Sequence, residues 1–369
     1  MRAGDYGSVT FRSTQTATDD RSHPAEVPMS GNTSFRHQGT SILSVEAADA
    51  PIVVPSTQFD AALSDTYERL GLRPGLLEEV AGIVERRWWP EDVSYADAAA
   101  RAGEQAIEAA GIDRSKIGLL IDTSVCRAHL EPSAAVDVHR QLSLPSSCLN
   151  FDLSNACLGF VNAMHIAATM IDAGQVRYAL IVDGEGSRLL QETTLERLSR
   201  EETTTADIFA EFASLTLGSG GAAMVLGPSE LHPEGHRLIG GESRAGTQHN
   251  DLCVGSIDHM RTDTKALLEA GLQVADATWI TARENGWDWD AAEHYILHQI
   301  SEVHTQLMCK QLGLDLERVP KTFPHRGNIG PASIPTTLAL HQEQIKPGDT
   351  VVIGGIGSGI NTLGSEILW

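Results

Sequence analysis

Hydrophobic and polar residues follow one another along this chain in a pattern that predicts a mixed α/β protein. A continuous apolar run at 117–124 (IGLLIDTS) indicates a buried strand, and YALIVDGEGSR from Tyr178 indicates another that runs into a glycine turn. Between them, the alternating run CLNFD leads through a small-residue turn into a run to Gly174 that is apolar almost all round. This stretch predicts a strand, a tight turn and a buried helix that ends at a C′ glycine.

The rest of the first half also alternates between the patterns of strands and of helices. The pattern predicts a strand from Ser41, a helix near 57–70, an alanine-rich amphipathic helix that ends at Gly111, a helical excursion at 188–213 with a capping box at Thr193 and Glu196, and one or two short strands at 215–227.

The second half repeats the order of the first. Buried strands (IGLLIDTS and HYILHQIS), turns into buried helices (SNACLGF and GNIGPAS) and strands into glycine turns (YALIVDGEGSR and DTVVIGGIGSG) recur in sequence. We therefore predict two fused α/β halves, at 39–228 and 229–369, with the turns at Cys157 and Asn328 near a common pseudo-twofold axis. Residues 1–38 are polar and aperiodic, and we expect a disordered or loosely attached leader.

Composition excludes several classes of partner. The chain has 369 residues, 41% of them hydrophobic, and a formal charge of −22 with a pI near 4.9, which opposes binding to nucleic acid or to an anionic membrane. No apolar run is long enough to span a membrane and the N-terminus has no export signal, so we expect a cytoplasmic protein. The five cysteines are odd in number and form no CxxC pair, which predicts reduced thiols and no structural zinc.

Cys157 is the first candidate for chemistry. It follows a polar turn and opens the predicted buried helix, where free backbone N–H groups and the helix dipole favour a thiolate, although apolar burial opposes one. A free cysteine is more often a small buried hydrophobe, but the polar turn before it and the glycine after it favour a nucleophile.

His298 and Asn328 complete a candidate set. His298 ends an apolar strand, and Asn328 lies in the glycine-flanked turn GNIG. Either could be an ordinary buried polar residue, yet a cysteine, an imidazole and an amide together suit acyl transfer, in which negative charge develops on oxygen.

Two other motifs carry no chemistry. His294 and His298 have the i,i+4 spacing of a helical zinc site, but in a strand that spacing separates them by about 13 Å. The glycines of GIGSG lead into another strand-like run instead of a helix, which excludes a dinucleotide-binding loop. We expect no bound metal and no cofactor.

With these residues in place, the chain resembles the thiolase superfamily. The motifs SNACLGF, HQIS, GNIGPASIP and GIGSG are similar to those of the ketoacyl-acyl-carrier-protein synthase III branch, and SVCRAHLEPS and TLERL are similar to the OleA group, the acyl-CoA condensing enzymes of bacterial olefin biosynthesis. The likeness runs from about residue 42 to the C-terminus. In synthase III proper an asparagine usually stands where this chain has Ser301.

The resemblance implies a fold and a set of roles. The fold would be the thiolase fold, with two βαβαβαββ halves in a five-layer αβαβα arrangement, in a dimer. Cys157 would carry the acyl group, His298 and Asn328 would hold an enolate oxygen, and the N–H groups of Cys157 and Ser358 would form a second oxyanion site. Glu131, which composition alone would leave as a surface residue, would reach into the partner subunit as the general base.

The implied reaction is a non-decarboxylative, head-to-head Claisen condensation of two fatty acyl-CoAs to a 2-alkyl-3-oxoacyl product. Candidate contacts for CoA, which needs cations and a stacking surface, are Arg86, Arg87, Trp88, Arg261 and Lys265. Two alternatives stay open: a decarboxylating synthase III that uses a malonyl donor, and a subunit that pairs with a catalytic paralogue. The acyl chain lengths and the final product, whether olefin, β-lactone or ketone, do not follow from the sequence.

Overall fold

The computed structural model describes residues 33–369, so residues 1–32 of the leader expected at 1–38 lie outside the described residues. The described chain joins the sheet at once. Strand β1 (Thr33–Arg36) pairs antiparallel with β9 (His236–Ala245), which puts the ordered part several residues before the boundary expected at 38.

One large mixed sheet organises the molecule, with the strand order β12-β13-β14-β9-β2-β8-β7-β5-β6. β5 is parallel to both β6 and β7, whereas β8 and β2 continue the sheet antiparallel; β12 and β13 are also parallel. The bounds are β2 (Thr40–Asp49), β5 (Ile117–Asp122), β6 (Leu149–Asp152), β7 (Tyr178–Glu185), β8 (Gly220–Pro228), β12 (His294–Leu297), β13 (Thr350–Gly357) and β14 (Asn361–Leu368).

The sheet passes from one half to the other between β2 and β9, through Ser41 with Arg237 and Ile42 with His236. Helices α6 (Gly159–Asp172) and α12 (Ser333–His341) lie between the half-sheets and share one hydrophobic core with strands of both. Successive side chains of a strand point to opposite faces of the sheet and so enter different hydrophobic cores. Ile181 of β7 faces α6, while its neighbours Leu180 and Val182 face α4.

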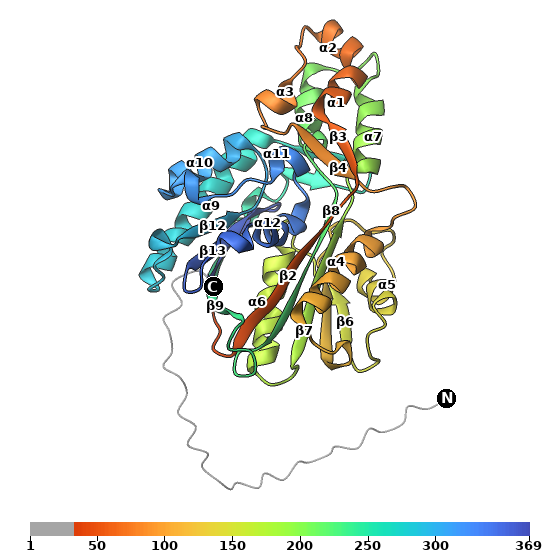
Figure 1. The fold of residues 1–369 in the computed structure, drawn as a ribbon. Coiled ribbons are helices and arrows are strands. Elements are labelled where there is room, and N and C mark those ends of the chain that lie inside the picture. The colour runs from red at the N-terminus through yellow and green to blue at the C-terminus, as the bar shows by residue number, and fades with distance from the viewer. Residues whose placement is uncertain (1–32) are drawn as a thin grey trace, which may run out of the picture.

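Outer helices cover the two remaining faces. α4 (Tyr95–Ala110) and α5 (Ala134–Gln141) pack on the first half-sheet, and α9 (Thr264–Glu284) and α10 (Glu302–Leu312) pack on the second. The expected five-layer αβαβα arrangement is therefore confirmed (Figure 1). Within residues 33–369, no helix is both long and apolar enough to cross a membrane.

The repeat is less regular than expected. Between α10 and α12 the described chain has no counterpart of β6, and β9 occupies a stretch in which the sequence pattern predicts no strand. The polar residues of β9 made it look like a loop in the sequence. One of them, Glu242, can be buried because it accepts hydrogen bonds from the Trp287 indole (2.9 Å) and the Asn285 amide (3.0 Å). The division expected after residue 228 falls between β8 and β9.

A helical cap, formed by residues 52–88 and 188–215, stands at one end of the sheet (Figure 1). Its two expected helices are each broken into two, and the expected capping box is wrong, since Thr193 lies inside α7 and Thr204 with Asp207 caps α8 instead. The cap contains β3 (Ile52–Pro55), α1 (Ser56–Ala62), α2 (Ser64–Leu70), α3 (Leu76–Glu79), β4 (Glu85–Trp88), α7 (Arg188–Leu198) and α8 (Thr205–Leu215).

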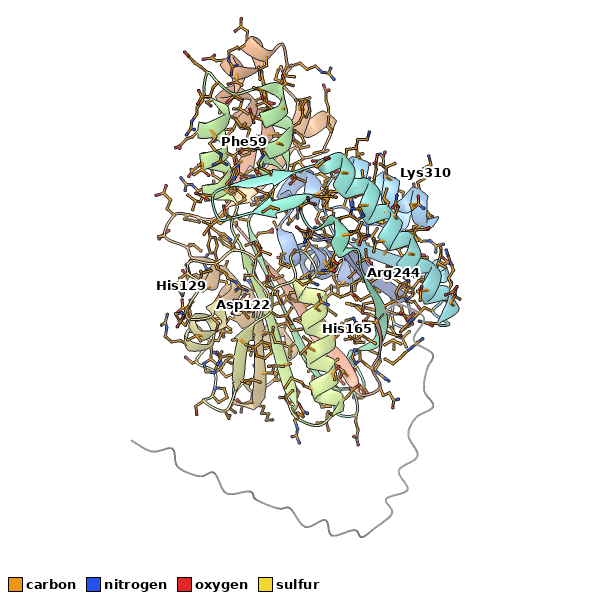
Figure 2. All side chains as sticks on the ribbon, turned by 180° about the vertical axis from the view of Figure 1, so that it is seen from behind. Phe59, Asp122, His129, His165, Arg244 and Lys310 are labelled. Atoms are coloured by element: carbon orange, nitrogen blue, oxygen red, sulfur yellow. The ribbon has the colours of Figure 1, made fainter. Side chains whose placement is uncertain are left out.

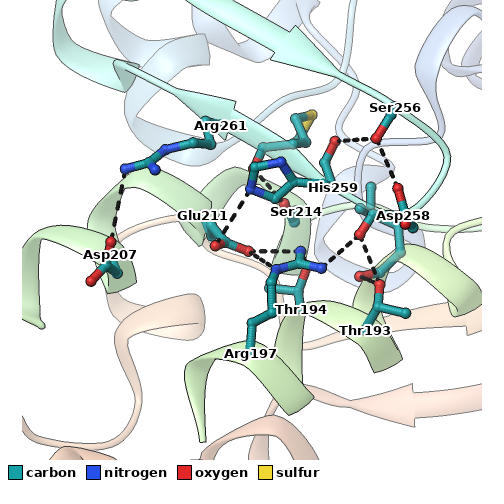
Figure 3. A network of polar contacts seen from close by, with 12 residues as sticks. Thr193, Thr194, Arg197, Asp207, Glu211, Ser214, Ser256, Asp258, His259 and Arg261 are labelled. Atoms are coloured by element: carbon teal, nitrogen blue, oxygen red, sulfur yellow. Dashed lines mark hydrogen bonds and ion pairs between the residues drawn. The ribbon is translucent and has the colours of Figure 1, made fainter. Parts of the chain in front are cut away.

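A small hairpin, β10 (Cys253–Gly255) and β11 (Met260–Thr262), is tied to this cap by polar contacts (Figure 3). Arg197 of α7 donates to the Glu211 carboxylate of α8 at 2.8 Å and to the backbone oxygen of Asp258 in the hairpin turn at 2.8 Å. The hairpin also reaches the Cys157 region, because the Ser358 hydroxyl donates to the Cys253 carbonyl at 3.0 Å.

Candidate active site

Cys157 lies in a constrained turn between β6 and α6. The sequence pattern places Cys157 at the start of the buried helix. In the structure the helix begins at Gly159, so the cysteine precedes it by two residues. Ala156 holds a φ of 45°, a region that costs a non-glycine residue free energy and needs support from the surrounding structure. The turn packs directly on the end of β5, since a Cβ on Gly159 would lie 3.2 Å from the Thr123 carbonyl oxygen.

Burial decides the protonation state of this thiol. It raises the pKa of Cys157 to about 12, and the nearby Cys253 and Glu185 act in the same direction, against the backbone N–H groups of Ser358 and Cys157, which lower it. Of the two opposing effects that the sequence indicates, burial is the larger, so Cys157 is a thiol at neutral pH and its proton must leave as it reacts. The same N–H groups show that Ser358 lies beside the sulfur.

The high pKa gives a direct prediction. From pH 7 to pH 10, alkylation of Cys157 by iodoacetamide should rise about tenfold per pH unit without a plateau, because the thiolate fraction rises by that factor below the pKa. Intact-protein mass with peptide mapping measures the rate, and Cys157→Ala gives the background from the other thiols. A plateau below pH 8 would contradict a thiol that is protonated at neutral pH.

His298 directly follows β12, and its backbone N–H donates to the Gly354 carbonyl at 2.9 Å. The ring is 2% exposed, and neither ring nitrogen has a hydrogen-bond partner within residues 33–369. Burial, with a smaller contribution from His304, lowers the pKa of His298 to about 3. The imidazole is therefore neutral at physiological pH and can donate one N–H to a substrate oxygen.

Asn328 is fixed by its backbone and by its own side chain. Its N–H donates to Thr216 O, and its carbonyl accepts from the N–H of Gly218, both at 2.9 Å. The side-chain Oδ1 accepts the Gly330 N–H at 3.0 Å, which assigns the orientation of the amide. The NH₂ group is thus left as a donor.

Two glycines of β13 bring the cysteine turn and His298 together. A Cβ on Gly355 would lie 2.6 Å from the His298 Cβ, and a Cβ on Gly357 would lie 3.2 Å from Leu158 Cγ. Residues two apart on a strand are separated by about 6.6 Å, so both elements lie against one short stretch of β13. The Cys157 turn and His298 therefore lie against the same stretch of β13, next to Ser358.

Glu131 does not join them within one chain. It is exposed in the loop between β5 and α5, and its neighbour Leu130 is 95% exposed. His129 of the same loop lies at the edge of the molecule (Figure 2). Residues 129–132 are all exposed, so the tip of the loop is available to a second copy of the chain.

Comparisons with known proteins agree with this geometry. A family model for 3-oxoacyl-[acyl-carrier-protein] synthase III matches residues 151–245, and one for the C terminal of that family matches residues 282–369. The chain is 43% identical over 335 residues to the acyl-CoA:acyl-CoA alkyltransferase of Xanthomonas campestris pv. campestris, covering 90% of this chain and 99% of that protein. The chain belongs to the OleA family.

Other relatives place the chain within the wider superfamily of acyltransferases. An acyl-CoA:acyl-CoA alkyltransferase of Shewanella oneidensis is 31% identical over 87% of this chain and 96% of its own, and a β-ketoacyl-acyl-carrier-protein synthase III of Sodalis glossinidius is 31% identical over 78% of this chain and 88% of its own. A crystal structure of a cysteine-to-serine variant of Xanthomonas campestris OleA with bound lauric acid and lauroyl-CoA matches with a TM-score of 0.88 and 42% identity, over 90% of this chain and all of that one. This chain therefore has the OleA fold and is an acyltransferase of the acyl-CoA condensing type.

Two of the residues expected to contact CoA lie in the interior of this protein. Arg86 is wholly buried and donates to the backbone oxygens of Val54 (3.3 Å) and Leu215 (2.9 Å), so it holds the cap together. Trp88 is 7% exposed, and its indole N–H donates to Gln191 at 2.6 Å. Both assignments as CoA contacts are wrong, because neither side chain can reach a ligand at the surface in this structure.

The other three candidates remain accessible. Arg87 is half-buried, with its guanidinium 3.6 Å from the Glu85 carboxylate. Arg261 is exposed and lies 3.8 Å from Asp207 (Figure 3), and Lys265 is exposed near Glu269. Exposed ion pairs of this kind are weak, so a phosphate could replace the carboxylate partner.

Proposed function

We propose that this protein condenses two fatty acyl-CoAs head to head, without decarboxylation, to a 2-alkyl-3-oxoacyl thioester. The observation that carries the proposal is the convergence of the Cys157 turn with a neutral, unpartnered His298 at β13, together with a glutamate displayed on an outward-pointing loop. The family supports it, because relatives that share this fold are acyl-CoA:acyl-CoA alkyltransferases.

In the first half-reaction, the sulfur of Cys157 attacks the carbonyl carbon of one acyl-CoA. The thiol proton passes to the departing CoA sulfur, and CoA leaves as a thiol. The developing oxyanion accepts hydrogen bonds from the backbone N–H groups of Cys157 and Ser358, which lie at the sulfur. The product is an acyl-cysteine thioester.

In the second half-reaction, Glu131 of the partner subunit removes an α-proton from the second acyl-CoA, and the enolate oxygen accepts hydrogen bonds from His298 and the Asn328 amide. The enolate carbon attacks the acyl-cysteine carbonyl, and collapse of the tetrahedral intermediate expels the Cys157 thiolate, which takes up a proton. A neutral imidazole suits this role, since an imidazolium would give its proton to the enolate.

The dimer is part of the proposal. β6 is a four-residue edge strand of the sheet, its Leu149 is 51% exposed, and Leu130 stands clear of its own chain. An unpaired edge beside exposed apolar side chains favours pairing with a second copy, which would place the Glu131 loop against the partner's Cys157. A heterodimer with a paralogue would use the same surface. Olefin or β-lactone biosynthesis in the cytoplasm, with no cofactor besides CoA thioesters, is the setting that we propose.

The proposal predicts that malonyl-CoA is unnecessary. Purified protein with myristoyl-CoA alone should give a product that keeps all carbons of both acyl groups, and added malonyl-CoA should not raise the yield, because Glu131 generates the carbanion that decarboxylation supplies in other enzymes. Mass spectrometry of the product measures both results. A strict need for a malonyl donor would move the protein to the decarboxylating synthase III class, which the relative from Sodalis glossinidius represents.

A further inference from the structure

The loop that carries Glu131 is anchored at both ends by carboxylates. At its start, the Val125 N–H donates to Oε1 of Glu185 at 2.6 Å. At its end, the N–H groups of Ala134 and Ala135 donate to the two oxygens of Asp152, at 3.0 and 2.9 Å. Glu185 ends β7 and Asp152 ends β6, which are the two neighbours of the strand from which the loop departs.

Anchors and tip differ sharply in burial. The Glu185 side chain is 5% exposed, whereas residues 129–132 are exposed. Burial raises the pKa of Glu185 to about 7, opposed by hydrogen bonds from the Cys126 thiol and the Val125 N–H. A buried carboxyl group that accepts backbone N–H groups fixes the chain locally and leaves the tip to project.

Glu185 also touches the other side of the site. A Cβ on Gly330 would lie 3.4 Å from Cδ of Glu185, so the carboxyl group packs directly on this glycine. The N–H of the same glycine holds Oδ1 of Asn328. One side chain therefore contacts the start of the base-bearing loop and the turn that orients the enolate-binding amide.

We infer that Glu185 is a positioning residue for condensation, which holds the start of the Glu131 loop and the Asn328 turn in place at once, while Asp152 fixes the far end of the loop. The inference rests on the proposed function. Each Glu185 would therefore act on both active sites of the dimer. It positions Asn328 in the site of its own chain and Glu131 in the site of the partner subunit. Sequence reasoning missed it, although a glutamate at the end of the buried run YALIVDGE was the visible signal.

The test compares three variants with a matched control. Glu185→Leu removes the acceptor, Glu185→Gln keeps a carbonyl oxygen for the Val125 N–H, and Val125→Pro removes the donor at a half-exposed position without changing Glu185. The control is Glu242→Leu, because Glu242 is also fully buried and accepts hydrogen bonds, but lies in β9, remote from the loop.

We expect Val125→Pro, which leaves the Glu185 carboxyl group in place, to be acylated on Cys157 by myristoyl-CoA within about threefold of the wild-type rate. Both Val125→Pro and Glu185→Leu should condense about 10²-fold more slowly, because a displacement of about 1 Å has that cost. Glu185→Gln should condense within about tenfold of wild type. Hydrogen exchange of the peptide that contains residues 125–131 should speed up in the first two variants only. Glu242→Leu should show neither the split between acylation and condensation nor faster exchange in this peptide.

Any of three results would overturn the inference. The first is that Val125→Pro loses acylation and condensation equally. The second is that Glu185→Gln condenses as slowly as Glu185→Leu, and the third is that the Glu242→Leu control also keeps acylation but loses condensation. If wild-type protein condenses only with malonyl-CoA, the proposed function fails instead, and the exchange measurement still reports whether Glu185 holds the loop. If Glu185→Leu does not fold, Val125→Pro and Glu185→Gln decide the outcome.

Discussion

Chains that carry Cys157→Ala and chains that carry Glu131→Ala will recover condensation when they are combined in a heterodimer, although neither homodimer condenses acyl-CoA. Glu131 is exposed on the loop between β5 and α5, and we propose that the base of each site comes from a second copy of the chain. Loss of a general base costs about 10²–10⁴ in rate, and loss of the nucleophile removes acylation itself. In the heterodimer, the site that keeps Cys157 receives an intact Glu131 and is complete.

Co-expression with two different tags and tandem purification gives the heterodimer, and product mass gives the activity. Each Glu131→Ala homodimer should still form the acyl-cysteine, which separates the two half-reactions and serves as the control for folding. If a confirmed heterodimer is as inactive as both parents, Glu131 acts within its own chain or has no catalytic role, and the shared site is wrong.

Gly355→Ala should be nearly as damaging to condensation as His298→Ala. The new Cβ would lie 2.6 Å from the His298 Cβ, a separation that carbon atoms do not tolerate, so the imidazole or β13 must shift. Loss of one donor to a developing oxyanion costs about 10²–10³ in rate, and we expect both variants in that range.

Gly118→Ala is the matched control for this substitution. It adds the same methyl group to a strand of the other half, where the nearest atom would be 3.5 Å away, an ordinary contact. Steady-state condensation and a thermal melt should be measured for all three variants. A Gly355→Ala enzyme with wild-type activity would show that His298 does not need its present place.

Much of the fold was predictable because buried strands and the central helix carry an unmistakable apolar pattern. β5, β7 and α6 have few exposed residues, and their sequences show it. β9 was missed for the opposite reason, since one oxygen of its buried Glu242 accepts hydrogen bonds from side chains just beyond the end of α9, which no local pattern reveals. The contacts that stabilise β9 therefore come from residues far away in the sequence.

The site divides in the same way. Cys157, His298 and Asn328 stood out because each follows or opens a recognisable element, and the structure places the Cys157 turn and His298 against the same stretch of β13. The protonation state of Cys157 did not follow, because burial outweighs the nearby N–H groups and only the packed structure shows the balance. Arg86 and Trp88 were misjudged because a cation beside an aromatic ring is typical of a CoA site and equally of a cap interior, where Arg86 stacks 4.4 Å from the Phe59 ring.

The central claim is that both acyl groups come from the same pool of acyl-CoA. Purified protein should be given equal amounts of unlabelled and uniformly ¹³C-labelled myristoyl-CoA, with malonyl-CoA present, and the product analysed by mass spectrometry. We expect three product masses, with one, both or neither acyl group labelled, and the singly labelled product twice as abundant as either of the others. Two product masses, each one acyl group extended by unlabelled malonyl carbons, would contradict the claim.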